Sequence, residues 1–291
     1  MSLKNYCFDG SKKLDLEKIP TNSKKDKVDK EKIIAKTKEN QEKISELQDK
    51  LYADGREGLI IILQAMDAAG KDSTVKQVMS GVNPTGVDVI SFKSPSSEEL
   101  AHDFLWRVNK VIPSRGKIAI FNRSYYEDVL VVQVKEFNKT YHQADRVINI
   151  KSKPFFEKRY AHIRNYEDYL YDSSYRIVKI FLNVSKEKQK ERFLERIDMP
   201  SKNWKFSSGD LVERALWDKY HEVYEDVINN TASKEAPWYV LPADQKWYTR
   251  YLVSEAILDS LKKIDPQYPV MPGDEQARLD ECRQQLMNED K

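Results

Sequence analysis

A short loop of small residues that ends in Gly70 and Lys71 carries the clearest chemistry of the sequence. It follows an apolar run, residues 59–63, and precedes a segment of helical composition. Such a loop turns backbone N–H groups toward phosphate oxygens, and the helix adds the positive end of its dipole. The lysine supplies a mobile positive charge. We expect the phosphate contacts to come from Ala68, Ala69, Gly70, Lys71 and Asp72.

The same loop contains an acid, Asp67, which would repel phosphate unless a divalent cation lay between them. Mg²⁺ is held by one or two carboxylates together with phosphate oxygens, so the sequence predicts that Asp67 binds Mg²⁺. Asp72 stands where the usual pattern has a metal-contacting hydroxyl. It either helps to hold the metal or is a first-turn acid that the helix dipole favours. The alternative for the whole loop is a strand-to-helix turn without a ligand.

A second group of candidate residues begins at the end of the strand expected over residues 117–122. Arg123 can grip a phosphate with two parallel hydrogen bonds. Glu127 and Asp128 follow about one helical turn later. They either face the crevice as catalytic groups, positioning a metal-bound water or an acceptor, or serve as first-turn acids of a helix.

Basic residues gather in the helix expected over residues 186–197 and in the loop after it. Arg192 and Arg196 are four residues apart and therefore share a helix face. Glutamates are interleaved with them, so part of this set is ordinary surface pairing. Lys202 and Lys205 flank Trp204, a pattern that suits a lid over a polyanion or a platform for a base.

These residues are carried by alternating strands and helices. Five apolar strands are expected, over residues 59–64, 87–92, 117–122, 175–183 and 238–241. Helices are expected over residues 27–52, 71–80, 97–112, 125–137, 153–171, 186–197, 207–229 and 246–264. This order predicts an α/β fold with a five-stranded parallel sheet and helices on both faces. Ligands of such sheets bind outside the carboxyl ends of the strands, where Lys93 and Arg123 should join the loop.

The chain divides into three parts by composition. Residues 1–25 are expected to form a flexible N-terminal arm, and residues 26–264 a single domain with a lid at about 186–208. Residues 265–291, rich in proline at their start, form a C-terminal tail.

Composition limits the function classes. The 291 residues carry a formal net charge of only +2, which identifies no partner. The 2 cysteines, Cys7 and Cys282, lie near opposite ends of the chain, which fits a reducing compartment without a disulfide framework. Residues 1–30 lack a signal-peptide pattern, and no apolar run could span a bilayer. We expect a cytoplasmic protein. The four histidines show neither metal nor triad spacing.

Several motifs, in this order along the chain, together resemble the polyphosphate kinase 2 family. They are residues 63–72 (LQAMDAAGKD), 81–84 (GVNP), 121–128 (FNRSYYED), 202–207 (KNWKFS) and 236–239 (APWY). The resemblance runs from about residue 30 to about residue 262. It implies a three-layer P-loop kinase fold with a helical lid, Mg²⁺ as cofactor, and a homodimer or homotetramer.

The resemblance also implies roles. Asp67 would hold Mg²⁺, and Lys71 and Arg123 would contact the transferring phosphate. Further residues are implied to bind polyphosphate, along its path or in the lid: Arg192, Arg196, Lys202 and Lys205. The Tyr-Glu-Asp ending at residues 126–128 is similar to the class III subgroup, which accepts nucleoside mono- and diphosphates. One departure is Ala65, where the family commonly has glycine.

These observations predict a Mg²⁺-dependent, reversible in-line transfer of phosphate from inorganic polyphosphate to AMP and/or ADP. The expected partners are polyphosphate and adenine or guanine nucleotides, with neither nucleic acid nor membrane. Two alternatives stay open. An ATP-dependent nucleoside monophosphate kinase would have a similar loop and crevice. A non-catalytic polyanion-binding protein would use the basic lid alone, but would have little need for Asp67.

Overall fold

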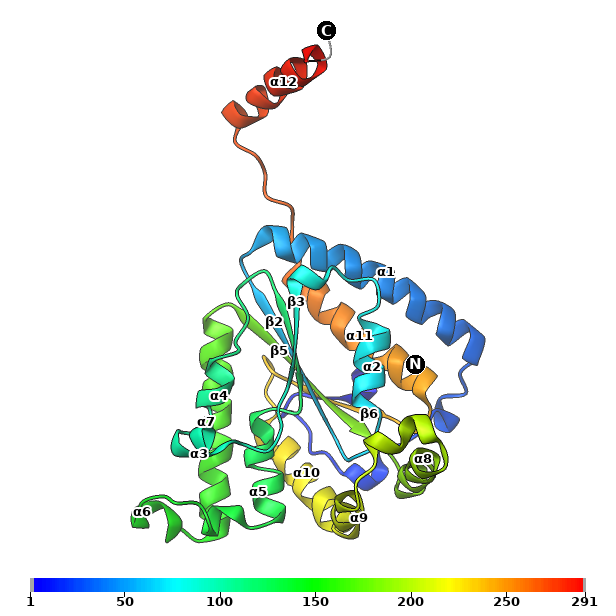
Figure 1. Ribbon diagram of the computed structural model, residues 1–291, viewed down its shortest axis with the longest axis vertical. Helices are drawn as coiled ribbons and strands as arrows, with labels where there is room; N and C mark the ends of the chain where they lie inside the picture. The colour runs from blue at the N-terminus through cyan, green and yellow to red at the C-terminus, as the bar shows by residue number, and fades with distance from the viewer. Residues whose placement is uncertain (1–2, 290–291) are drawn as a thin grey trace.

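The computed structural model describes residues 3–289 and contains one six-stranded sheet (Figure 1). The strand order is β1-β6-β5-β2-β4-β3. The strands are β1 (Cys7–Phe8), β2 (Gly58–Ala65), β3 (Val87–Ser91), β4 (Ile118–Asn122), β5 (Tyr175–Asn183) and β6 (Trp238–Pro242). Strands β2 to β6 run parallel, and β1 is antiparallel to β6. The expected parallel strands are confirmed, but the expected number of five was wrong because β1 had not been recognised.

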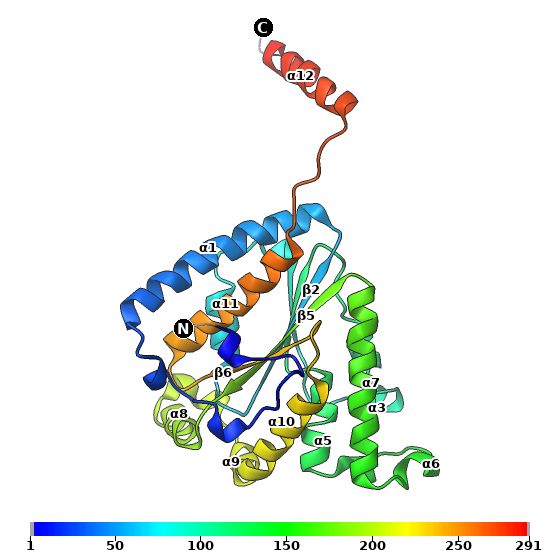
Figure 2. The same cartoon turned by 180° about the vertical axis from the view of Figure 1, so that it is seen from behind.

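The helices lie in two layers, one on each face of the sheet (Figures 1 and 2). Helices α1, α2 and α11 cover one face, and α7, α10, α5 and α4 cover the other. Helices α8 and α9 lie beyond the carboxyl ends of the strands. The bounds are α1 (Lys30–Asp54), α2 (Lys71–Val78), α3 (Ser97–Ala101), α4 (Trp106–Asn109), α5 (Val131–Val134), α6 (Asp145–Ile148), α7 (Ser152–Asp172), α8 (Lys186–Asp198), α9 (Gly209–Ala215), α10 (Trp217–Thr231), α11 (Lys246–Ile264) and α12 (Gly273–Asn288).

Seven short 3-10 helices complete the secondary structure of the described residues. They are Leu3–Tyr6, Leu16–Lys18, Lys24–Asp26, Pro84–Gly86, Tyr125–Asp128, Phe137–Lys139 and Pro200–Lys205. The single helix expected over residues 97–112 was wrong, since the chain leaves α3 at His102 in an extended conformation before α4 begins. The helix expected over 125–137 is likewise a 3-10 turn followed by α5.

The N-terminal segment is packed rather than loosely held, so the expected flexible arm over residues 1–25 was wrong for its described part; residues 1–2 lie outside the described chain. Phe8 pairs with Trp238 in the sheet. Tyr6, Leu14 and Leu16 are buried in the hydrophobic core. Apolar side chains spaced along the segment cover core surface that would otherwise contact water.

The register of the central strands determines where the site residues meet. Leu63 of β2 pairs with Asn122 of β4 on one side and with Ile180 of β5 on the other. The loop after Ala65 and the residues after Asn122 therefore leave the sheet side by side. All eight residues of β2 are buried, as expected for the centre of a parallel sheet.

A buried ion pair lies inside the apolar layer beneath α7. The Lys179 Nζ of β5 donates to the Glu167 carboxylate at 2.5 Å and to the Thr231 carbonyl at 2.8 Å. Glu167 also accepts hydrogen bonds from the hydroxyls of Tyr125 and Tyr126, at 2.7 and 2.8 Å. Because a buried charge is tolerated only when paired and hydrogen-bonded, this network fixes the start of the Tyr125–Asp128 turn.

The tail ends in α12, which stands away from the body on an extended connection (Figure 1). None of its described residues is buried. In the described part of the chain, no helix has the length and apolar character needed to cross a bilayer.

Candidate active site

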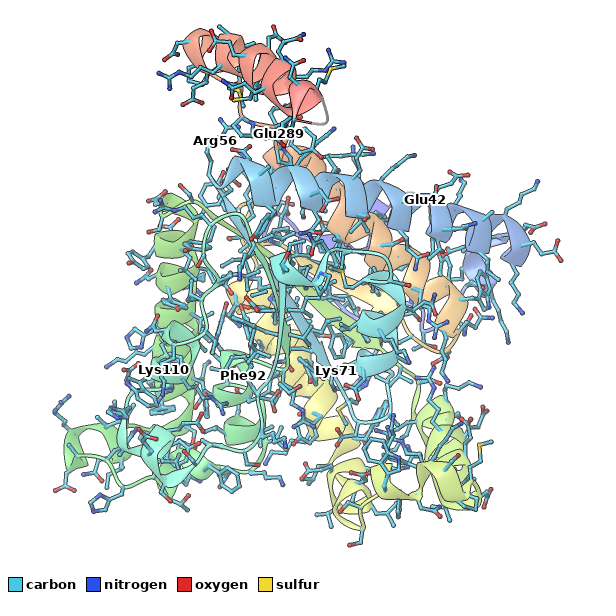
Figure 3. All side chains as sticks on the ribbon, turned by 45° about the horizontal axis from the view of Figure 1, so that its top comes forward. Glu42, Arg56, Lys71, Phe92, Lys110 and Glu289 are labelled. Carbon is cyan, nitrogen blue, oxygen red and sulfur yellow. The ribbon has the colours of Figure 1, made fainter. Side chains whose placement is uncertain are left out.

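The loop between β2 and α2 needs unusual backbone angles to make its turn. Gly70 has a φ of 104° and Ala68 a φ of 58°. Glycine reaches such angles without the steric cost that a side chain brings. The turn delivers the chain into α2 with Lys71 as its first residue (Figure 3).

Three consecutive carbonyl groups of this loop point toward α8. The carbonyl oxygens of Asp67, Ala68 and Ala69 accept hydrogen bonds from side chains of α8. The first N–H of α2 with an acceptor in the preceding turn is that of Thr74, which donates to the Gly70 carbonyl at 3.0 Å. Helix geometry leaves the three N–H groups before it without such acceptors. They are available to an anion at the helix N-terminus.

Lys71 folds back toward the loop, and its Nζ donates to the Ala65 carbonyl at 3.0 Å. Burial and the nearby Arg123 guanidinium lower the pKa of Lys71 to about 8, although Asp67 and Glu127 oppose that change. The ammonium is therefore close to its titration range in the free protein. A bound phosphate would keep the ammonium charged to higher pH, because an anion favours the protonated form.

Arg123 connects the two halves of the site. Its guanidinium lies 2.9 Å from the Asp67 carboxylate and 3.4 Å from that of Glu127. Glu127 raises the pKa of Arg123 further above its ordinary value, with Asp67 contributing, so the guanidinium stays charged. Burial raises the pKa of Glu127, although Arg123 and Lys71 act in the opposite direction. The arginine has a φ of 64°, a conformation that costs free energy and is found mostly at functional sites.

One cavity of about 360 Å³ opens over the loop, and we call it the cationic cavity. Seven basic side chains line it, against four acidic ones, so it is suited to a polyanion. The basic residues are Lys71, Arg123, Arg192, Arg196, Lys202, Lys205 and Lys246, and the acidic ones are Asp67, Asp72, Glu195 and Asp210.

The cations of α8 and the following turn differ in how firmly they are held. Arg192 is buried, and its guanidinium donates to the carbonyls of Ala68 and Ala69 at 2.9 and 2.8 Å. Arg196 donates to the Lys205 carbonyl at 3.2 Å. Lys202 pairs with Glu195 in α8.

Lys205 lies over the ring of Trp204, 4.9 Å from its centroid, and Trp204 is 78% exposed. Exposed charges of this kind can turn toward a ligand at little cost, because surface ion pairs are weak.

A second cavity, of about 380 Å³, lies on the other side of Asp67 and Arg123, and we call it the aromatic cavity. Its wall contains the rings of Phe137, Tyr220 and Tyr224 together with Met66 and Val131. Its charged residues are mostly acidic: Asp67, Glu127, Asp210 and Glu213, against Arg123 and Lys135. Aromatic and aliphatic side chains combined with polar groups that can fix orientation are typical of a site for a small organic ligand.

Three of the predicted site residues lie elsewhere or have other partners. Asp72 accepts a hydrogen bond from the Asn122 side chain at 2.7 Å, at the edge of the cationic cavity. Lys93 is exposed and lines neither cavity. Asp128 lines a separate small cavity with Arg107 and Arg159, where burial raises its pKa to about 6. The structure does not bring Lys93 and Asp128 to the loop.

Sequence reasoning missed part of both cavities. Lys246 lines the cationic cavity, and its place at the start of a helix after β6 was an available signal. Asp210 lies in the walls of both cavities. The wall of the aromatic cavity comes from α5, α10 and the segment near Phe137, and no local sequence motif predicts it.

The donor set around Asp67 fits a hard divalent cation. Among the described residues, no group of three or more His, Cys, Asp or Glu side chains could form a complete protein metal site. Asp67 nevertheless faces both cavities, and Glu127 faces the aromatic one. One or two carboxylates completed by phosphate oxygens is the arrangement in which Mg²⁺ is usually bound.

Comparison with known proteins identifies the family of this chain. The sequence model of the family described as Polyphosphate kinase 2 (PPK2) matches residues 27–269. An ADP-polyphosphate phosphotransferase of Rhodopseudomonas palustris is 44% identical over 286 residues, which are 98% of each chain. An AMP/ADP-polyphosphate phosphotransferase of Meiothermus ruber is 47% identical over 227 residues, 78% of this chain and 80% of that one. The crystal structure of a polyphosphate kinase 2 from Arthrobacter aurescens superposes with a TM-score of 0.84 and 37% identity, covering 97% of both chains.

Proposed function

The chain belongs to the polyphosphate kinase 2 family, and from that premise we propose that it transfers phosphate from inorganic polyphosphate to AMP and ADP. The reaction is reversible, since a phosphoanhydride is broken and another is formed. The names of the two relatives, one acting with ADP and the other with AMP or ADP, support both acceptors. Adenine is the proposed base for the same reason.

One observation supports this function above the others: two cavities of different chemistry share Asp67 and Arg123. A phosphoryl transfer needs a donor and an acceptor that meet at one charged point. The cationic cavity suits the polyphosphate chain, and the aromatic cavity suits a nucleotide. The transferring phosphate would then lie at the residues common to both.

The chain's own residues would act by positioning and charge. The loop N–H groups and Lys71 hold the terminal phosphate, and Arg123 offers its guanidinium to the same group. Charge spread over the phosphate oxygens in the transition state is stabilised by these preorganised donors. The acceptor is a nucleotide phosphate that is already ionised at neutral pH, so no strong general base is required.

Mg²⁺ is the proposed metal, held by Asp67 and phosphate oxygens. When bound, it would neutralise charge on the two substrates and bring their phosphates together. Glu127, partly buried and 3.4 Å from Arg123, would orient that guanidinium.

The test is an assay of the purified protein with Mg²⁺, long-chain polyphosphate, and AMP or ADP in turn, with the products separated. We expect ADP and ATP to form. If AMP is phosphorylated only when ATP is the donor, the protein is a nucleoside monophosphate kinase instead. If polyphosphate is retained but no nucleotide is converted, it is a polyanion-binding protein.

We further propose a cytoplasmic homodimer or homotetramer, in line with the family. Light scattering of the purified protein at several concentrations tests the oligomeric state. A monomer at all concentrations would contradict it.

A further inference from the structure

Two side chains of α8 donate hydrogen bonds to carbonyl oxygens of the phosphate loop. Gln189 Nε2 donates to the Asp67 carbonyl at 3.0 Å, and Arg192 Nη1 donates to the carbonyls of Ala68 and Ala69. Gln189 is 1% exposed and Arg192 is 8% exposed. We call Gln189 and Arg192 the loop clamp. Three consecutive carbonyl oxygens of the loop are thus turned toward α8.

The terminal donors of Arg192 are fully used. Its two terminal nitrogens carry four N–H groups. Nη1 serves the two loop carbonyls, and Nη2 donates to the carbonyls of Ala243 and Asp244 at 2.7 and 3.1 Å. Only the Nε–H remains for any other ligand. Arg196 differs, because it makes one carbonyl hydrogen bond and a longer ion pair with Asp210, at 3.6 Å.

Gln189 is held at both ends of its amide. While its nitrogen donates to the loop, its Oε1 accepts from Arg214 Nη1 at 2.8 Å. The same nitrogen of Arg214 donates to the Lys186 carbonyl at 2.7 Å. Gln189 is neutral and buried, so it contributes to the site through geometry and not through charge.

The hydrogen bonds to α8 matter because the N–H and the C=O of one peptide group point in opposite directions. A peptide whose carbonyl faces α8 therefore turns its N–H away from α8. A loop peptide that rotates would point a carbonyl oxygen at the phosphate and repel it. Donors on the far side stabilise the orientation in which the carbonyls face α8. The N–H groups of Ala68 and Gly70 are then left for the cationic cavity before the substrate arrives, while that of Ala69 donates to the Met66 carbonyl at 3.3 Å. Donors fixed in advance are the preorganisation that electrostatic catalysis requires.

We propose that Gln189 and Arg192 are positioning residues that set the peptide orientation of the phosphate loop, and that Arg192 does not bind polyphosphate directly. This differs from the role that the family resemblance implied for Arg192. The inference rests on the proposed function, because it assigns the loop to phosphate binding.

The first experiment measures hydrogen exchange of the loop amides, residues 66–72, in the protein without substrate. The variants are Arg192→Lys, which keeps the charge but loses the planar fork, and Gln189→Leu, which is neutral in both forms. Two further variants are controls. Arg196→Gln removes another cation that lines the cationic cavity, and Lys190→Gln changes an exposed residue of the same helix. We expect loop exchange to rise about tenfold or more in both clamp variants and to stay unchanged in the other two.

The second experiment measures turnover and polyphosphate binding. Arg192→Lys and Gln189→Leu should each lower kcat on the order of 10²-fold, as loss of preorganised donors does elsewhere. The double variant should cost little more than either single one, because both hold one loop. The slope of log binding constant against log salt should stay at the wild-type value in Arg192→Lys and Arg192→Gln. In Arg196→Gln it should become shallower by about 0.7 to 0.9, by analogy with nucleic acids.

The outcomes distinguish a failure of the positioning role of Gln189 and Arg192 from a failure of the proposed function. If Arg192→Lys exchanges and turns over like the wild type, while Arg192→Gln flattens the salt dependence as Arg196→Gln does, Arg192 is a phosphate ligand and the inference is wrong. If the wild type neither binds nor uses polyphosphate, the proposed function fails first. Thermal unfolding of every variant shows whether a loss comes from the site or from the fold. A clamp variant that unfolds below the assay temperature is replaced by Arg214→Lys, which reaches the loop through Gln189 and otherwise alters the hydrogen bond to the Lys186 carbonyl.

Discussion

The cationic cavity and the aromatic cavity share Asp67, Arg123 and Asp210 but are otherwise built in different ways. The cationic cavity takes its basic side chains from the loop, α8 and the turn after it, several of them exposed and in weak pairs. The aromatic cavity takes rings from separated segments and is slightly acidic. A polymer of repeating charge needs attraction without a fixed register, whereas a nucleotide needs a shaped wall. The difference therefore indicates that the cationic cavity selects polyphosphate and the aromatic cavity selects the nucleotide.

The strongest test removes a charge from the place where the two cavities meet: Asp67, which lines both, or Lys71, which lines the cationic one. In Asp67→Asn and in Lys71→Ala, we expect kcat to fall on the order of 10³-fold, because a preorganised charge at the transferring phosphate is lost. Steady-state rates with each substrate varied in turn measure this. Both acceptors should be affected equally. Turnover near the wild-type value in either variant would contradict the assignment of these two residues.

A change confined to the cationic cavity should separate the substrates. For Lys205→Ala and Lys202→Ala, we expect the KM for polyphosphate to rise about 10-fold, since a hydrogen bond to a charged group contributes about 1.5–3 kcal/mol. The KM for AMP should stay within about twofold. Should the KM for AMP rise instead, the two cavities have been assigned to the wrong substrates.

The matching change in the aromatic cavity is Phe137→Ala. Stacking of a base on an aromatic side chain contributes about 1–3 kcal/mol, so we expect the KM for AMP to rise about 10-fold and that for polyphosphate to stay constant. Tyr169→Ala is the control, since Tyr169 is exposed on α7 and lines neither cavity. An equal effect of both variants would mean that Phe137 does not contact the base.

The smallest effect concerns pH. The pKa of Lys71 is about 8 in the free protein, so its charge is present below that pH and is lost as pH rises through it. We expect kcat/KM for polyphosphate to fall tenfold per pH unit above about pH 8. The alkaline limb of the kcat profile should begin at a higher pH, because bound phosphate favours the charged ammonium. Lys71→Arg should remove this limb, since arginine stays charged. A limb that survives in Lys71→Arg belongs to another group.

The two cavities also differ in how far the sequence predicts them. Lys71, Arg123, Lys202 and Lys205 lie in compact motifs, where type and spacing alone indicate phosphate chemistry. Lys135, Tyr220 and Tyr224 are ordinary residues of amphipathic helices, and only the packing of α5 against α10 makes them neighbours. No local pattern in a single sequence predicts which face of one helix will pack beside another helix to form a cavity wall.

The parallel strands were predictable because each is a continuous apolar run between turn signals. Strand β1 was not, since two residues carry no periodicity and their pairing with β6 depends on distant sequence. Asp128 was expected at the loop because it follows Glu127 directly. The 3-10 turn at Tyr125–Asp128 sends the two neighbouring carboxylates in different directions, toward Arg123 and toward Arg107 and Arg159.

The pairing of β1 with β6 also affects how the molecule behaves toward its neighbours. Phe8 covers one end of the β6 edge, and further along the Thr21 carbonyl accepts from the Asp244 N–H at 2.9 Å. Without this cover, an apolar strand would present unpaired backbone groups, which are a template for association with other chains. Deleting residues 3–21 should therefore promote aggregation even though it removes no residue of either cavity.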